Sequence, residues 1–299
     1  MSSVVRVAED IYQIDAQLAA ADRPLTSYLI AGSPAALIEN GPASAIPVIL
    51  EALRQVGQEP AQVAFIIPTH IHLDHAGGAG QLARLWPWAQ VVFHEQGFRH
   101  MIEPTRLIAS TKKAFGDNFE DIFGSIVPVA EAQVKVVKGG ETLALGRREL
   151  KIIYAPGHAP HHIAIYDSLS RGLFCGEALG LPLGETDYVM PSAIPPGFDL
   201  EATLDTYDRL EKISPSILFY SHDGVSRDVA RRIQAVRSST RRVGDLVKAG
   251  MEAGEDLAGV CQRVGRGLTE DGLSVAVEQL FPLVAGYVFY FQRRGTERG

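Results

Sequence analysis

The sequence predicts an α+β fold with a layered αββα core and a helical extension. Short apolar runs separated by Gly, Pro and Asp turn residues alternate with amphipathic segments over the first 225 residues. This alternation occurs in two successive halves, and each half contains both strands and helices. After Ser226 the apolar residues keep a helical spacing almost to the end of the chain. We therefore expect one domain over residues 1–225 and a helical extension over residues 226–299 that packs on it.

The elements of the first half follow from the period of their apolar residues. Alternating or β-branched runs predict strands at 4–7, 11–14, 27–31, 35–39, 63–67 and 90–93. Helical spacing predicts helices at 45–56 and 79–85, a helix that begins near Glu95, and a helical insertion at 104–123. The run 63–67 is compact and β-branched, which is typical of a buried strand, and it ends at Pro68.

The second half begins with an extended segment at 127–137. Hairpin-like strands are predicted at 142–145, 149–154, 163–167 and 172–175, followed by a helix at 200–213 and a strand at 217–220. The apolar run 280–291 is shorter than the roughly 18 residues that span a bilayer, so a buried helix is expected there.

The composition is that of an ordinary globular protein, with 46% apolar and 21% charged residues. A net charge of −7 without a basic stripe argues against a nucleic-acid partner. Cys175 and Cys261 form neither a CxxC pair nor a disulfide framework. The first residues lack the pattern of a signal peptide. We expect a cytoplasmic protein that does not bind a membrane.

Four residues able to bind a metal ion fall within six positions at the end of the strand predicted at 63–67. They are His70, His72, Asp74 and His75. Alternate residues of an extended chain point the same way, so His70 and His72 can share one ion. The chain must then turn into a helix, which can direct Asp74 and His75 at a second ion. Imidazole and carboxylate ligands with an open position are what a catalytic divalent site requires.

Further candidate ligands follow later strands, as two coordination shells would require. His158 lies in Ala155-Pro156-Gly157-His158, after the strand ending at Tyr154. Glu177 and His222 come after two more strands, each beside a glycine. Functional residues of a rigid fold are concentrated in such loops.

The sequence resembles the metallo-β-lactamase superfamily in this HxHxDH motif, in Gly157-His158 and in the later His222. The resemblance covers roughly residues 5–225 and implies a four-layer αββα sandwich as the catalytic domain. It implies that His70, His72 and His158 bind a first metal ion. Asp74, His75 and His222 would bind a second ion, with a bridging carboxylate between the two.

The bridging position departs from the family pattern, which usually has Asp where this chain has Glu177. The extra methylene group moves the carboxylate by roughly 1.5 Å, so Glu177 can bridge two ions, bind one, or leave the second site weak. Glu39 also stands where the family commonly has Asp, in an outer-shell position. His162 matches a common outer-shell histidine, and His161 replaces a residue that is often Gly.

The resemblance implies a metal-dependent hydrolase that uses a metal-bound hydroxide. Two divalent ions are expected, with zinc first and iron or manganese as alternatives, because the same ligand set suits all three. Asp74 is the candidate catalytic residue that handles the proton of the attacking water. Glu39 and His162 would orient the metal ligands by hydrogen bonding. Tyr188 and Cys175 are more typical of a surface tyrosine and a buried thiol than of catalytic groups.

Three regions are expected to shape the substrate pocket: the insertion 104–123 with Phe115, Phe119 and Phe123, the loop 184–198, and the helical tail. Their apolar residues favour an ester, thioester or lactone of a small molecule. The segment 173–180 and the tail resemble the quinolone-response thioesterase branch of the superfamily. A homodimer through the C-terminal helices is also predicted.

Three other functions stay open at this point. They are a phosphodiesterase, a mononuclear iron sulfur dioxygenase, which weak binding of the second ion would favour, and a non-catalytic homologue that senses a ligand.

Overall fold

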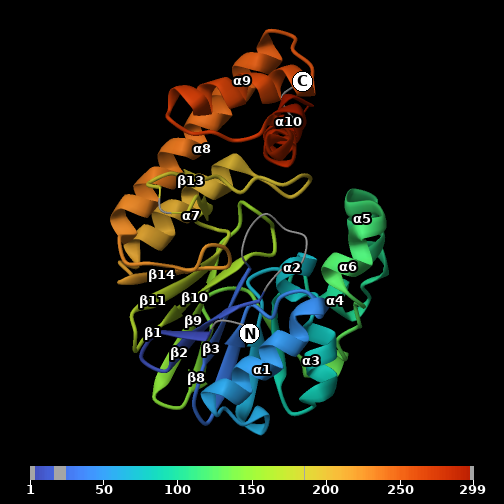
Figure 1. Cartoon of the computed structure of the whole chain (residues 1–299), viewed down its shortest axis with the longest axis vertical. Coiled ribbons are helices and arrows are strands. Elements are labelled where there is room, and N and C mark those ends of the chain that lie inside the picture. The colour runs from blue at the N-terminus through green and yellow to red at the C-terminus, as the bar shows by residue number, and fades with distance from the viewer. Residues whose placement is uncertain (1–3, 17–24, 185, 297–299) are drawn as a thin grey trace. The chain divides into compact units, whose positions relative to one another are not determined.

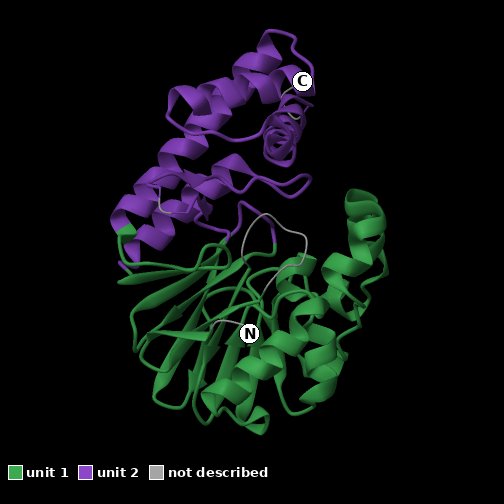
Figure 2. Cartoon of the chain, viewed as in Figure 1, with its two compact units in different colours: residues 1–155, 161–176, 215–229 green, residues 156–160, 177–214, 230–299 purple. Residues whose placement is uncertain are grey.

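A computed structural model describes residues 4–16, 25–184 and 186–296, and these form two compact units (Figures 1 and 2). The first unit consists of Met1–Ala155, His161–Gly176 and Pro215–Val229. The second consists of Pro156–Pro160, Glu177–Ser214 and Ala230–Gly299. The units therefore interleave along the chain, and the domain boundaries predicted at 1–225 and 226–299 stay a prediction.

The first unit begins with a seven-stranded sheet in the order β1-β2-β3-β4-β5-β6-β7. Its strands are β1 (Val4–Ala8), β2 (Ile11–Asp15), β3 (Thr26–Ile30), β4 (Ala35–Ile38), β5 (Val63–Ile67), β6 (Gln90–His94) and β7 (Val134–Val137). Pairing is antiparallel from β1 to β4 and parallel from β4 to β7. The parallel half is almost continuously apolar, as expected for strands covered on both faces.

A second sheet of six strands completes the β-structure of this unit, in the order β15-β14-β11-β10-β9-β8. Its strands are β8 (Thr142–Leu145), β9 (Arg148–Tyr154), β10 (Ile163–Asp167), β11 (Gly172–Gly176), β14 (Ile217–Tyr220) and β15 (Val225–Ser226). One apolar core contains residues from both sheets, among them Ile38, Ile152 and Phe174. The two sheets therefore pack face to face through this core.

Helices cover the other face of the first sheet (Figure 1). They are α1 (Ile46–Val56), α2 (Leu73–Ala76), α3 (Ala79–Leu85) and α4 (Arg99–Ile102), whereas α5 (Thr105–Phe115) and α6 (Phe119–Phe123) pack with Leu73 in a separate cluster. Ile49 and Leu53 of α1 and Leu82 of α3 are buried in a core that they share with the sheet. The spacing of these residues follows the helical period, which accounts for the amphipathic pattern in the sequence.

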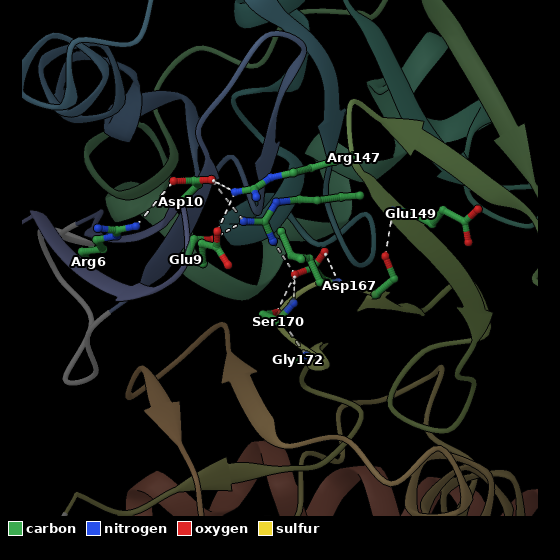
Figure 3. A network of polar contacts seen from close by, with 11 residues as sticks. Arg6, Glu9, Asp10, Arg147, Glu149, Asp167, Ser170 and Gly172 are labelled. Carbon is green, nitrogen blue, oxygen red and sulfur yellow. Dashed lines mark hydrogen bonds and ion pairs between the residues drawn. The ribbon is translucent and has the colours of Figure 1, made fainter.

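A buried ion pair ties β9 to β10 at one end of the second sheet (Figure 3). Nη1 of Arg148 donates to Oδ2 of Asp167 at 2.6 Å, and both side chains are almost fully buried. The same carboxylate accepts hydrogen bonds from the backbone and hydroxyl of Ser170. Arg148 also donates to the carbonyl of Glu9, in the turn between β1 and β2. Each charge is therefore paired and hydrogen-bonded, as burial requires.

The second unit contains a short hairpin, β12 (Leu181–Pro182) and β13 (Val189–Met190), and four helices. The helices are α7 (Leu200–Lys212), α8 (Val229–Glu252), α9 (Leu257–Glu270) and α10 (Phe281–Thr296). Asp199 and Asp256 cap the first turns of α7 and α9 by accepting from backbone N–H groups. Val247, Val264 and Tyr287 lie in an apolar core shared by α8, α9 and α10. Among the described residues, no helix is long and apolar enough to cross a membrane.

The insertion predicted to be helical at 104–123 forms two separate helices, α5 and α6, in the structure. The first helix ends at Gly116, which has a φ of 59° that favours glycine, and the chain restarts as α6. The ring of Phe123 still contacts those of Phe115 and Phe119, with centroids 5.0 Å and 5.3 Å apart, and only Phe115 is exposed, at 47%. The extended segment predicted at 127–137 forms a strand only at Val134–Val137. Residue 185 of the predicted loop 184–198 lies outside the described residues.

Candidate metal centre

The HxHxDH segment follows β5 directly and brings two imidazoles of the first unit together. His70 is buried, and its Nε2 lies 2.9 Å from Nδ1 of His72. His72 has extended backbone and immediately precedes α2. The alternation of an extended chain therefore places His70 and His72 on one side, as the sequence predicts.

A second donor group lies in the same unit, where α2 meets the loop after β14. Nε2 of His75 lies 3.2 Å from Oδ2 of Asp74, and Nε2 of His222 lies 3.9 Å from the same oxygen. One ligand atom from each of these residues falls within 4.8 Å of the others. The structure thus brings together Asp74, His75 and His222, although His222 is far along the chain.

Glu39 lies at the end of β4 and contacts two residues of the HxHxDH region. Thr69 donates from its hydroxyl to Oε1 of Glu39 at 2.5 Å and from its backbone N–H to Oε2 at 3.2 Å. Nδ1 of His75 lies 3.2 Å from Oε1 of Glu39. Because the Thr69 proton is given to Glu39, the hydroxyl oxygen is left to accept from Nδ1 of His70, 3.1 Å away. That arrangement leaves Nε2 of His70 with a lone pair for a metal ion.

Gly176, the last residue of β11, gives the histidines the space they need. A Cβ atom at this position would lie 2.5 Å from Oγ1 of Thr69 and 2.7 Å from Nε2 of His162. Its φ of 54° also favours glycine. The His162 ring is buried and stacks on His70, with ring centroids 4.9 Å apart.

Tyr28 holds the loop that carries His222. Its hydroxyl lies 2.7 Å from the carbonyl oxygen of Tyr220 and 2.9 Å from that of Gly224. Asp223 and Gly224 both have left-handed backbone, so the chain reverses tightly around His222. Burial raises the pKa of Tyr28 well above its ordinary value, so this hydroxyl stays a donor.

The second unit holds its own group of ligand-type residues, His158, Glu177 and Ser192. Nε2 of His158 lies 2.9 Å from Oε2 of Glu177, and both side chains are buried. The Ser192 hydroxyl donates to Oε1 of Glu177 at 2.9 Å and lies 2.9 Å from Nδ1 of His158. Two of these three residues are expected ligands, and Ser192 was not singled out by the sequence.

Three other residues considered from the sequence lie outside these hydrogen-bonded groups. His161 stacks on His70 with ring centroids 6.2 Å apart. Cys175 is buried, and burial raises the pKa of its thiol well above the ordinary value, which favours a structural role. Tyr188 was predicted as a surface tyrosine, but its hydroxyl is buried. This burial raises the pKa of Tyr188 to about 12.

The donor atoms fit a divalent metal ion. Two donors at about 2.0–2.1 Å from one tetrahedral ion lie roughly 3.3 Å apart. The separations of 2.9 Å between His70 and His72, 3.2 Å between Asp74 and His75, and 2.9 Å between His158 and Glu177 are close to this value. Imidazole nitrogen and carboxylate oxygen are ligands that zinc, iron and manganese accept. These residues are therefore able to hold a metal ion.

Comparison with known proteins decides the family. A family model described as the metallo-beta-lactamase superfamily matches residues 21–222, which is more than half of the 299 residues. The chain belongs to the metallo-β-lactamase superfamily. The α+β fold and the enzyme class, a metallo-β-lactamase-fold hydrolase, are thereby confirmed.

Similar sequences within the superfamily have several names. The chain is 27% identical to the metallo-beta-lactamase fold-containing protein ST1585 from Sulfurisphaera tokodaii, over 71% of this chain and 80% of that protein. It is 33% identical to a hydroxyacylglutathione hydrolase from Synechococcus sp., over 46% of this chain and 42% of that protein. It is 23% identical to an N-acyl homoserine lactonase from Bacillus cereus, over 58% of this chain and 62% of that protein.

Solved structures share the fold over most of the chain. The metallo-beta-lactamase family protein TTHA1429 from Thermus thermophilus gives a TM-score of 0.75 at 21% identity and covers 96% of this chain and 94% of that chain. The structure of ST1585 gives a TM-score of 0.62 at 22% identity, over 79% and 87% of the two chains. At these identities the likeness concerns the fold alone.

Proposed function

We propose that the chain is a dinuclear metal-dependent hydrolase of small acyl compounds, an ester, thioester or lactone. In this proposal His70, His72 and His158 hold the first ion. Asp74, His75 and His222 hold the second, and Glu177 supplies the carboxylate between them. Zinc is the proposed metal.

The observation that carries the proposal is the pair of adjacent donor groups in the first unit. His70 with His72, and Asp74 with His75 and His222, come from two separate places in the sequence, the HxHxDH segment and the loop after β14. Imidazole nitrogens this close share either a proton or a cation, and a cation can be bound by all members of such a group at once.

Chain connectivity supports the assignment of His158 and Glu177 to the same centre. Glu177 directly follows Gly176, whose Cα lies against Thr69 and His162 of the first unit. His158 lies on a five-residue segment, Pro156–Pro160, that has first-unit residues on both sides in the sequence. Each residue therefore lies within a few positions of first-unit residues, and the first unit contains the histidine groups.

Bound divalent ions would supply an acidified water molecule and a Lewis acid for the substrate carbonyl group. Asp74 is the proposed group that accepts the proton of that water. Its side chain is 28% exposed, whereas those of His75 and His222 are 0% and 10% exposed, so water reaches its carboxylate most easily. Glu39 orients His75 directly and His70 through Thr69. His162 packs against His70 and limits the tilt of that ring.

The acyl substrate class is supported by the names of two relatives, a hydroxyacylglutathione hydrolase and an N-acyl homoserine lactonase. Both names describe hydrolysis of an acyl compound. The proposed likeness to the quinolone-response thioesterase branch falls within this class. The apolar tail gives less support than its sequence suggests, because Val284 and Tyr287 are fully buried in the core of the second unit.

Elemental analysis of metal per chain tests the proposal, with ester, thioester, lactone and phosphodiester assays on the same preparations. The wild type is compared with Glu177→Asp, which restores the usual residue of the family. Glu255→Asp is the matched control, because Glu255 is a partly buried carboxylate of the second unit that forms an ion pair with Arg263. We expect about two ions per chain and acyl hydrolysis that is lost on chelation and regained on reloading.

Other outcomes would overturn the proposal in distinguishable ways. About one iron per chain without hydrolysis would indicate the sulfur dioxygenase alternative. Cleavage of phosphodiesters only would indicate a phosphodiesterase. A chain that binds no divalent metal under any loading condition would leave a ligand-sensing role.

A further inference from the structure

Ser192 lies in the second unit between β13 and α7, and its side chain is 7% exposed. Its hydroxyl donates to Oε1 of Glu177 at 2.9 Å and lies 2.9 Å from Nδ1 of His158. Its backbone carbonyl oxygen lies 3.3 Å from the same nitrogen. One residue therefore contacts both candidate ligands of this unit through two different oxygen atoms.

The direction of these hydrogen bonds determines where the His158 proton lies. A hydroxyl has a single proton, and that of Ser192 is given to Glu177. The hydroxyl oxygen can then only accept from Nδ1 of His158, and the carbonyl oxygen of Ser192 is also an acceptor. Nδ1 faces two acceptors and so carries a proton, whereas Nε2 faces the carboxylate oxygen Oε2 of Glu177, with which it can share a proton or a cation.

This tautomer leaves the lone pair of His158 on Nε2, which lies 2.9 Å from Oε2 of Glu177. In the neutral ring, the lone pairs of Nε2 of His158 and Oε2 of Glu177 then face each other, and a cation bound to both atoms would stabilise this arrangement. Oε2 of Glu177 faces this nitrogen while Ser192 holds Oε1 of the same carboxylate. The hydroxyl thus selects the tautomer of one ligand and the orientation of the other.

We propose that Ser192 is a positioning residue that fixes His158 as the Nδ1–H tautomer and turns Glu177 toward the same metal ion. The inference rests on the proposed function, since it assigns Ser192 to that metal centre. Outer-shell partners of metal ligands commonly change metal affinity by about 10- to 100-fold when they are removed. Thr69 has the equivalent relation to His70 and Glu39 in the first unit.

The test compares Ser192→Ala with Ser192→Thr in the full chain. Ala removes the hydroxyl and keeps the backbone carbonyl, whereas Thr keeps the hydroxyl. Ser239→Ala is the matched control, because Ser239 is a buried serine of the second unit that donates to the carbonyl of Val189 and contacts neither ligand. Urea denaturation first establishes that all three variants are folded under the conditions of the measurements.

The first measurement is the tautomer of His158 in the metal-free protein, from long-range ¹H–¹⁵N spectra. We expect a protonated Nδ1 in wild type, Ser192→Thr and Ser239→Ala, whether or not Nε2 shares a proton with Glu177, and partial loss of the Nδ1 proton in Ser192→Ala. The second measurement is the zinc dissociation constant by competition with a chelator. We expect it to rise by about 10- to 100-fold in Ser192→Ala and by less than about twofold in Ser239→Ala.

A wild-type His158 that carries a proton on Nε2 but none on Nδ1 would overturn the inference, whatever the chain hydrolyses. An unchanged tautomer and wild-type zinc affinity in Ser192→Ala would do the same. Failure of the wild type to bind zinc, with the tautomer as expected, would instead count against the proposed function. If Ser192→Ala does not fold, Ser192→Cys, with its weaker donor, must show the same direction of change in both measurements.

Discussion

The hydroxyl of Thr69 donates a 2.5 Å hydrogen bond to Oε1 of Glu39, a residue 30 positions earlier in the chain. This bond joins the end of β4 to the start of the HxHxDH segment, since Glu39 follows β4 and Thr69 follows β5. The same hydroxyl lies 3.1 Å from Nδ1 of His70. A single side chain therefore connects a buried carboxylate to a proposed metal ligand.

Replacement of Thr69 by Val removes this connection at nearly constant volume. Glu39 loses a donor, and Nδ1 of His70 loses its acceptor, so we expect zinc affinity to fall by about 10- to 100-fold. Thr69→Ser keeps the hydroxyl and should bind zinc like the wild type. Thr240→Val is the control, because it removes a buried hydroxyl that bonds to Tyr207. Equal zinc affinity in Thr69→Val and Thr240→Val would contradict this role.

Tyr28→Phe should loosen the loop that carries His222. The Tyr28 hydroxyl is a hydrogen-bond donor to the carbonyl oxygens of Tyr220 and Gly224. Loss of such a buried donor lowers the free energy of unfolding by about 1–3 kcal/mol. We expect a similar loss of unfolding free energy in Tyr207→Phe, whose hydroxyl bonds to Thr240. Only Tyr28→Phe should also lower the metal content per chain. Chemical denaturation and elemental analysis measure the two effects, and full metal content in Tyr28→Phe would be the contrary result.

Arg148→Met should destabilise the first unit strongly. It leaves the Asp167 carboxylate buried without its cation, and breaking such a pair costs about 3–5 kcal/mol. Arg147→Met is the control, because the Arg147 side chain is 62% exposed and solvent screening leaves its ion pairs little effect on stability. Urea denaturation followed by a probe in the first unit measures both. Equal losses in the two variants would show that Arg148 acts as a surface charge.

The Cys175 thiol should resist alkylation in the folded protein. Burial raises its pKa well above the ordinary value, so the reactive thiolate is scarce at pH 8 and reagents reach it only after opening. We expect iodoacetamide to label it more than about 100-fold more slowly in buffer than in urea. Peptide mass spectrometry separates Cys175 from Cys261, which is also buried. Rapid labelling of Cys175 in the folded protein, with loss of hydrolysis, would instead indicate a catalytic thiol.

The sequence predicted those parts of the fold and site that depend on neighbours along the chain. His70 and His72 follow from the alternation of an extended segment, and α2 follows from the expected turn into a helix, which begins at Leu73. The two sheets follow from short runs with the period of strands. The insertion was predicted as one helix because its apolar spacing continues through Gly116, where the backbone requirement of one residue ends the helix.

The supporting residues could not be predicted because their partners are distant in sequence and their surroundings are irregular. Ser192 lies 34 positions after His158, in a segment without a helical or strand period. Tyr28 has the apolar neighbours of any buried strand residue, and its acceptors are 192 and 196 positions away. The one usable signal was at Thr69, whose hydroxyl directly precedes His70 in the sequence. How Glu177 shares ions stays a prediction, as does a homodimer through the C-terminal helices.

The interleaving of the two units limits how this protein can change during evolution or engineering. The chain passes between the units after Ala155, Pro160, Gly176, Ser214 and Val229. No single cut separates the helical unit as a module, because two of its segments are inserted between strands of the other unit. His158 and Glu177 travel with these segments, so exchanging them with a relative would exchange candidate ligands as well. New substrate preferences are therefore expected to arise by point substitution within these segments. A helical tail transplanted from a relative would have to start beyond Val229 to leave the candidate metal ligands unchanged.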